Sequence, residues 1–106
     1  MADEFKNYMV RSGKATLTEI KWSDNTAGGA QLADVIAYDW ENGADGRVDH
    51  LAMVTGFTND NYPLVTQHSP GRLNRGWSWD PDGINWIEFT HKGSAPICFS
   101  GGWVGR

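Results

Sequence analysis

The hydrophobic pattern predicts three strands in the middle of the chain. DVIAYDW (residues 34–40) and HLAMVTGF (residues 50–57) are rich in β-branched and aromatic residues, and Gly, Asn and Asp bound each run. The dipeptide Asp45-Gly46 between them favours a tight hairpin turn. The turn-forming segment TNDNYP then leads into a third run, LVTQH (residues 64–68). We therefore predict an antiparallel sheet made of consecutive hairpins.

The segments on either side of this sheet have weaker patterns. Residues 3–12 begin with a capping Asp and carry apolar residues at helical spacing, which predicts a short N-terminal helix. Residues 14–22 alternate imperfectly and predict a short edge strand or an extended segment, and residues 23–31 have the composition of a loop. Residues 77–89 predict a second hairpin in which Trp79 and Trp86 are cross-strand neighbours. The tail, residues 92–106, is expected to be partly ordered at best.

Two histidines at strand ends are the candidate chemistry. If residues 50–57 pair antiparallel with residues 64–68 so that paired residue numbers add to an even sum, His50 and His68 share one face of the sheet. An odd sum places them on opposite faces. On the even register, Ala52 and Val54 share the face of His50, and because the opposite face is also apolar, we expect both faces of this strand to be covered.

These segments carry a resemblance to a known family. An Asp-Val-Ile strand, an Asp-His pair that opens an apolar strand and a Gln-His pair that ends the next strand occur here in that order. In this respect the chain resembles the putative amidase domain of bacterial secreted proteins, a papain-like family related to the NlpC-type cell-wall peptidases. The resemblance covers roughly residues 5–92. It implies an α+β fold, with a papain-like antiparallel β-sheet and a short N-terminal helix.

The resemblance also implies a cysteine amidase or peptidase, a hydrolase in which His50 is the general base and His68 orients it. An imidazole held in one tautomer activates the thiol in such sites. The family's nucleophilic Cys precedes the base, but no Cys precedes His50 here. The resemblance therefore implies an inactive or incomplete site, with the Cys-bearing segment absent. Cys98 follows both histidines, as in circularly permuted relatives, but no helical pattern follows it to lower its pKa.

Composition and net charge limit the kinds of partner that the chain can bind. A chain of 106 residues is long enough for one small domain, with 40% hydrophobic residues, six Trp and thirteen Gly. Its net charge of −4 argues against nucleic acid as a partner. No apolar run is long enough to span a membrane, and the first residues do not resemble a signal peptide. Localisation is therefore unknown from the chain itself, whereas the family resemblance suggests secretion.

The remaining candidates are weaker. Two His residues make at most a partial zinc site, so we predict no metal and no cofactor. Asp49 neighbours His50 but points to the other face of a strand, which favours a salt bridge with Arg47 or contact with solvent, and His91 lies in a polar, solvated stretch.

Three functional classes stay open. The first is hydrolysis of a peptide or cell-wall amide. The second is a non-catalytic binding or assembly module, in which Trp77, Trp79 and Trp86 could form a sugar-stacking platform if they are exposed rather than in the core. The third is a structural piece that forms a homo-oligomer or binds a partner supplying the absent helix. We expect an oligomer because an uncovered sheet would expose an apolar face to which Val35, Val54 or the residues that alternate with them contribute.

Overall fold

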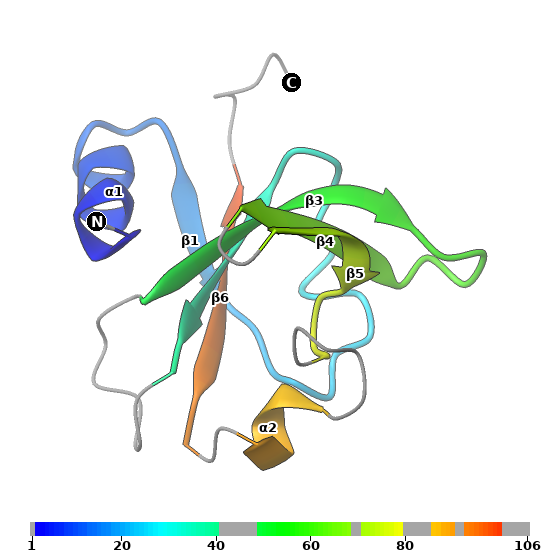
Figure 1. Ribbon diagram of the computed structural model, residues 1–106. Coiled ribbons are helices and arrows are strands. Elements are labelled where there is room, and N and C mark those ends of the chain that lie inside the picture. The colour runs from blue at the N-terminus through cyan, green and yellow to red at the C-terminus, as the bar shows by residue number, and fades with distance from the viewer. Residues whose placement is uncertain (1, 41–48, 69–70, 80–85, 91–92, 101–106) are drawn as a thin grey trace.

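The protein is a mostly β domain built on one antiparallel sheet. The computed structural model describes residues 2–40, 49–68, 71–79, 86–90 and 93–100 (Figure 1). Its elements are α1 (Ala2–Arg11), β1 (Thr16–Glu19), β2 (Val35–Asp39), β3 (His50–Phe57), β4 (Pro63–His68), β5 (Gly71–Gly76), α2 (Ile87–Thr90) and β6 (Ala95–Ser100). The described strands form one six-stranded sheet in the order β1-β6-β2-β3-β4-β5.

The central prediction is confirmed. The three runs predicted as strands are β2, β3 and β4, and β3 has the predicted bounds. The N-terminal helix and the edge strand β1 are also present, and the backbone N–H of Thr58 donates to the Tyr62 carbonyl across the predicted turn. The Asp45-Gly46 turn lies outside the described residues. The expected α+β class is confirmed only in its antiparallel sheet and short N-terminal helix, because the described helices are few and short.

The structure differs from the sequence prediction after β4. Residues 71–76 form β5, a strand that the sequence pattern did not predict, and residues 87–90 form the short helix α2 in place of a strand. Trp79 and Trp86 do meet, as an isolated antiparallel bridge. In the tail, residues 95–100 form β6, which lies between β1 and β2 (Figure 1). A segment expected to be partly ordered at best therefore contributes a central strand.

One face of the sheet carries the main hydrophobic core. Pairing across the ladders places Ile36 opposite both Ala52 and Cys98, so these three side chains share a face. Ile20, Ala27 and Ala30 from the preceding segment, and Trp77 and Ile87 from the later one, pack over this face. Most of the sheet's buried side chains lie on this face, because segments that precede and follow the central strands in the sequence both pack over it.

The opposite face is covered over part of its width by α1. Val35, Ala37 and Phe99 form a second, smaller core, and the ring of Phe5 in α1 stacks on Phe99 with centroids 6.4 Å apart. Val35 and Val54 are 8% and 1% exposed, so these two residues do not form an exposed apolar face, whereas Met53, which pairs with Val35, is 40% exposed. The oligomeric state stays a prediction.

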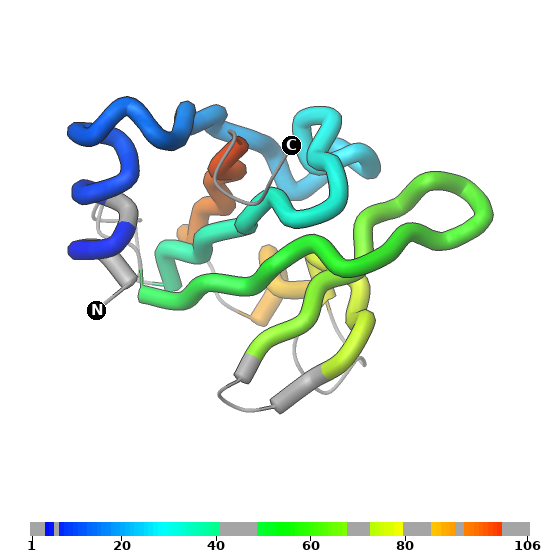
Figure 2. Tube along the Cα trace, turned by 90° about the horizontal axis from the view of Figure 1, so that it is seen from above, coloured from blue at the N-terminus to red at the C-terminus, as the bar shows by residue number. Residues whose placement is uncertain are grey.

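The middle of strand β3 is buried on one face and exposed on the other. Ala52 and Val54 are buried, whereas Met53 is 40% exposed and Thr55 is exposed. The expectation that both faces are covered was wrong here because α1 does not reach the arm formed by β3, β4 and β5, which projects away from it (Figure 2). The outer face of this arm carries Met53 and the hydrogen-bonded polar side chains of Thr55, Thr66 and Asn74.

A β-bulge in β3 divides the register of the β3–β4 pair. Near the turn Gly56 pairs with Leu64, an even sum, but before the bulge Val54 pairs with Val65 and Met53 with Thr66, which gives odd sums. The hydroxyl oxygen of Thr55 lies 2.7 Å from both Thr66 Oγ1 and Asn74 Oδ1, and these polar contacts hold the bulged residue. The register on the His50 side of the bulge is therefore not the even one on which a shared face of His50 and His68 depends.

The loop before β2 is fixed by side-chain to backbone hydrogen bonds. The carboxylate of Asp24 accepts from the backbone N–H groups of Thr26 and Gly28 and from the Thr26 hydroxyl, and the hydrogen bonds from Thr26 lower the pKa of Asp24. Ala33 has a φ of 72°, a backbone conformation that favours glycine.

The close packing at Gly76 leads to a stability prediction. A methyl group added there would lie 2.5 Å from Trp79 Cδ1 and 2.9 Å from Tyr62 Cε2. Gly76→Ala should therefore lower the free energy of unfolding by about 1–3 kcal/mol, measured by urea denaturation. Gly56→Ala is the matched control because its added carbon finds its nearest atom at 3.4 Å. Equal stability of the two variants would show that the Trp79 and Tyr62 rings are not fixed against Gly76.

Candidate functional site

His50 begins β3 with its ring half-buried and hydrogen-bonded to β4. Its Nε2 lies 2.5 Å from Oε1 of Gln67. The odd register on this side of the bulge produces the contact, because it places position 67 on the face that carries His50 and Ala52. A carbonyl oxygen can only accept a hydrogen bond, so Nε2 carries a proton, and in the neutral imidazole Nδ1 is then the nitrogen that has the lone pair. The partner of His50 in this structure is therefore an amide.

A stack of aromatic rings holds the imidazole from its other side. The His50 ring centroid lies 5.7 Å from that of Tyr38 and 5.9 Å from that of Trp40. Tyr38 and Trp40 stack on each other at 4.9 Å, and Trp22 continues the stack to the buried Trp77. Ring contacts on one side and a hydrogen bond on the other restrict both the position and the tautomer of His50.

Tyr38 has a structural role at this site, as the donor of a buried hydrogen bond. Its ring is buried, and its hydroxyl donates to the Trp77 carbonyl oxygen at 2.7 Å. Burial raises the pKa of Tyr38 well above its usual value. The phenol therefore stays protonated at physiological pH, and it cannot serve as a base or as a phenolate nucleophile.

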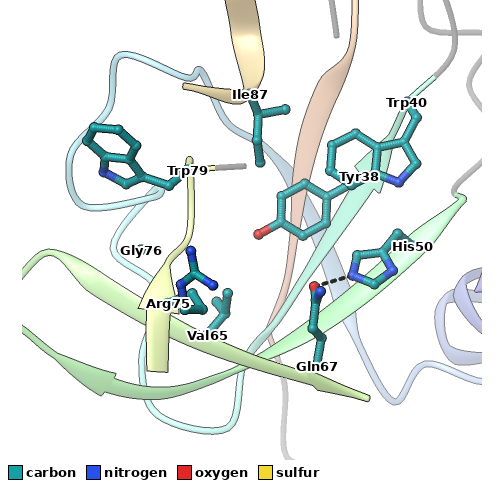
Figure 3. A pocket seen from close by; sticks show the side chains of 9 residues that line it. All are labelled: Tyr38, Trp40, His50, Val65, Gln67, Arg75, Gly76, Trp79 and Ile87. Carbon is teal, nitrogen blue, oxygen red and sulfur yellow. Dashed lines mark hydrogen bonds between the residues drawn. The ribbon is translucent and has the colours of Figure 1, made fainter. Parts of the chain in front are cut away.

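A narrow hollow opens beside His50. Its cavity volume is about 10 Å³, roughly the room of one water molecule. It is lined by Tyr38, Trp40, His50, Val65, Gln67, Arg75, Gly76, Trp79 and Ile87 (Figure 3). Arg75 and Val65 line the side opposite His50 and Trp40 (Figure 3). The described lining is aromatic and apolar except for the imidazole, one amide and one guanidinium, and it contains no carboxylate.

Cys98 lies too far from His50 to act with it. In the ladders flanking β2, Cys98 pairs with Ile36, whereas His50 pairs with Tyr38. Two strand spacings and a two-residue offset separate the Cα atoms of Cys98 and His50 by roughly 12 Å. The thiol is also buried, at 3% exposure, within the main core. The geometry therefore agrees with the sequence argument against Cys98 as nucleophile.

The structure describes the other predicted site residues only in part. The backbone of His68 ends β4, paired with Gly71, but its side chain lies outside the described residues, so its orienting role stays a prediction. His91 and Arg47 also lie outside them. The carboxylate of Asp49 accepts a hydrogen bond from the Trp40 backbone N–H at 2.9 Å and does not orient His50. Asp49 thus ties the start of β3 to the end of β2.

The predicted sugar-stacking platform does not form as three exposed rings. Trp77 is 0% exposed and lies in the core. Trp79 and Trp86 stack on each other with centroids 3.9 Å apart, and Trp86 is 38% exposed. Within the described part of the chain, no group of three His, Cys, Asp or Glu side chains could hold a metal ion.

With this geometry established, comparison with known proteins gives a family. Residues 1–91 match the putative amidase domain family. The chain belongs to this family. No curated protein and no solved structure matches the chain. The amidase-domain match contains His50 and the residues that line the hollow, but it ends before β6 (Ala95–Ser100), so a central strand of the sheet lies beyond the matched residues.

Sequence reasoning missed most of what surrounds His50 in this amidase domain. Tyr38 and Trp40 could have been placed beside His50, because alternation along β2 gives them one face. Gln67 and Arg75 could not, because a bulge and an irregularity in the β4–β5 pair set their positions. None of the described helices is long and apolar enough to cross a membrane.

Proposed function

We propose that this amidase domain carries the general base of a cysteine-dependent amide hydrolase, with His50 as that base and Gln67 as its positioning residue. The hydrogen bond between His50 Nε2 and Gln67 Oε1 carries the proposal. It leaves Nδ1 as the nitrogen that accepts a proton, and the His50 ring itself lines a hollow with aromatic residues. A papain-like relationship is part of this proposal, because such enzymes pair an oriented imidazole with a thiol.

The nucleophile in this proposal comes from outside the 106 residues. Cys98 is their only cysteine, and it is buried about 12 Å from His50 by strand geometry. A thiol positioned at Nδ1 would give its proton to His50 as sulfur bonds to the carbonyl carbon of a peptide or cell-wall amide. His50 would then return that proton to the leaving amine as the carbon–nitrogen bond breaks, and water would hydrolyse the thioester.

An external thiol can test the base without the missing nucleophile. Cleavage of p-nitrophenyl acetate is followed with protein alone, with 2-mercaptoethanol alone and with both together. The sulfur–acyl bond forms while the ester bond breaks, p-nitrophenolate leaves with the electron pair, and His50 takes the thiol proton. We expect little cleavage by the protein alone, and a rate with both together at least about tenfold above the sum of the separate rates, below the ~10²–10⁴ of a complete site.

Free imidazole at the same concentration is the control for unspecific base catalysis. If protein and thiol together cleave no faster than imidazole and thiol, His50 is not an accessible base and the proposal fails. The second candidate function would then be favoured: a binding or assembly module on the same scaffold. The specific observation behind that alternative is that no described thiol lies within reach of His50.

A further inference from the structure

Among the described residues, Arg75 is the one cationic side chain that lines the hollow beside His50. It lies on β5 opposite Val65 of β4, so both residues belong to the face of the sheet that carries the core and His50. The side chain is half-buried. Since the chain carries a net charge of −4, this guanidinium is a local feature and does not belong to a generally basic surface.

We propose that Arg75 selects amide substrates that carry a carboxylate close to the scissile bond. A guanidinium offers five N–H donors in a planar fork that matches a carboxylate, so it can contact the protein and a ligand at the same time. No carboxylate among the described lining residues repels such a group. The aromatic walls lower the local dielectric, which strengthens the attraction relative to one in open solvent.

The dimensions set where the substrate carboxylate lies. By strand spacing, the Cα atoms of His50 and Arg75 are roughly 16 Å apart, and both side chains reach into the intervening hollow from opposite sides (Figure 3). The hollow has room for about one water molecule, so the substrate lies across its opening and does not fill it. A carboxylate one residue from the scissile amide is close enough to that amide to reach Arg75 while the amide lies at His50. The aromatic rim then contacts the remainder of the substrate.

This inference rests on the proposed function, because it assumes that the bound molecule is a substrate. Binding of a carboxylate can nevertheless be measured without any reaction. The probes are N-acetylglycine, in which a carboxylate follows the amide by one residue, and N-acetylglycinamide, its neutral counterpart. Each is titrated into the protein in the absence of thiol, with chemical shifts of the His50 ring and the Gln67 and Arg75 side chains followed by NMR. The carboxylate should bind at least about tenfold more tightly than the carboxamide.

Variants locate the effect at Arg75. Arg75→Gln should abolish the preference for the carboxylate, and Arg75→Lys should keep part of it, because charge remains but the planar fork is lost. Arg11→Gln on α1 is the matched control and should leave the preference unchanged. Dispersed amide spectra would show that each variant is folded.

The outcomes separate this inference from the proposed function. Equal affinity of the two probes for the wild-type protein, or a preference that persists in folded Arg75→Gln, would overturn the inference even if thiol-dependent cleavage occurs. A carboxylate preference that depends on Arg75, without thiol-dependent cleavage, would instead leave an anion-binding site and remove the base function of His50.

Discussion

His50→Ala should abolish the rate enhancement that this domain gives to thiolysis of p-nitrophenyl acetate, a loss of at least about tenfold. The alanine removes Nδ1, the only nitrogen of this ring that the Gln67 hydrogen bond leaves able to accept a proton. The variant keeps His68 and His91, so it also measures what those imidazoles contribute to the background. The measurement is the release of p-nitrophenolate at equal protein and thiol concentrations.

Gln67→Leu separates positioning from base strength. It removes the acceptor but leaves the imidazole, so the rate should fall partway and the ring should populate both neutral tautomers, which imidazole ¹⁵N chemical shifts distinguish. Gln67→Glu keeps an acceptor oxygen and should retain the Nε2–H tautomer. If His50→Ala reacts as fast as the wild-type protein, or if Gln67→Leu leaves the tautomer unchanged, Gln67 does not position His50 as a base in solution.

Trp77→Ala should destabilise the domain more than Gly76→Ala does. Trp77 is fully buried, stacks on Trp22 at 5.6 Å, and lies among the side chains that cover the core face of the sheet. Truncating a buried Trp costs about 3–5 kcal/mol. Because small domains have total stabilities of about 5–15 kcal/mol, this loss removes a large share of the free energy of unfolding. Urea denaturation followed by far-UV circular dichroism measures the change.

Leu73→Ala is the control for the loss of apolar side-chain atoms. Leu73 is 78% exposed on β5, so its truncation should change the free energy of unfolding by no more than about 0.5 kcal/mol. Similar denaturation midpoints for Trp77→Ala and the wild-type protein would mean that the Trp22–Trp77 stack does not form the centre of the core.

The sequence by itself determined the hairpin core of this protein. Strands β2, β3 and β4 follow from runs of β-branched and aromatic residues separated by turn-forming residues, since local preference and burial agree in these runs. It also determined that His50 opens β3, and that Ala52 and Val54 share one buried face, because alternation along a strand needs no information about distant residues. The family resemblance likewise rested on these local motifs.

Only the tertiary structure decided which residue meets His50. The Thr55 bulge shifts the β3–β4 register from even to odd, and such a shift moves every side chain of the partner strand to the other face. The bulge is held by Thr66 and Asn74, which are distant in sequence, so no local pattern predicts it. The same reason applies to β6. Its tail sequence has little strand signal of its own, and it becomes a strand because β1 and β2 supply hydrogen-bonding partners on both of its edges.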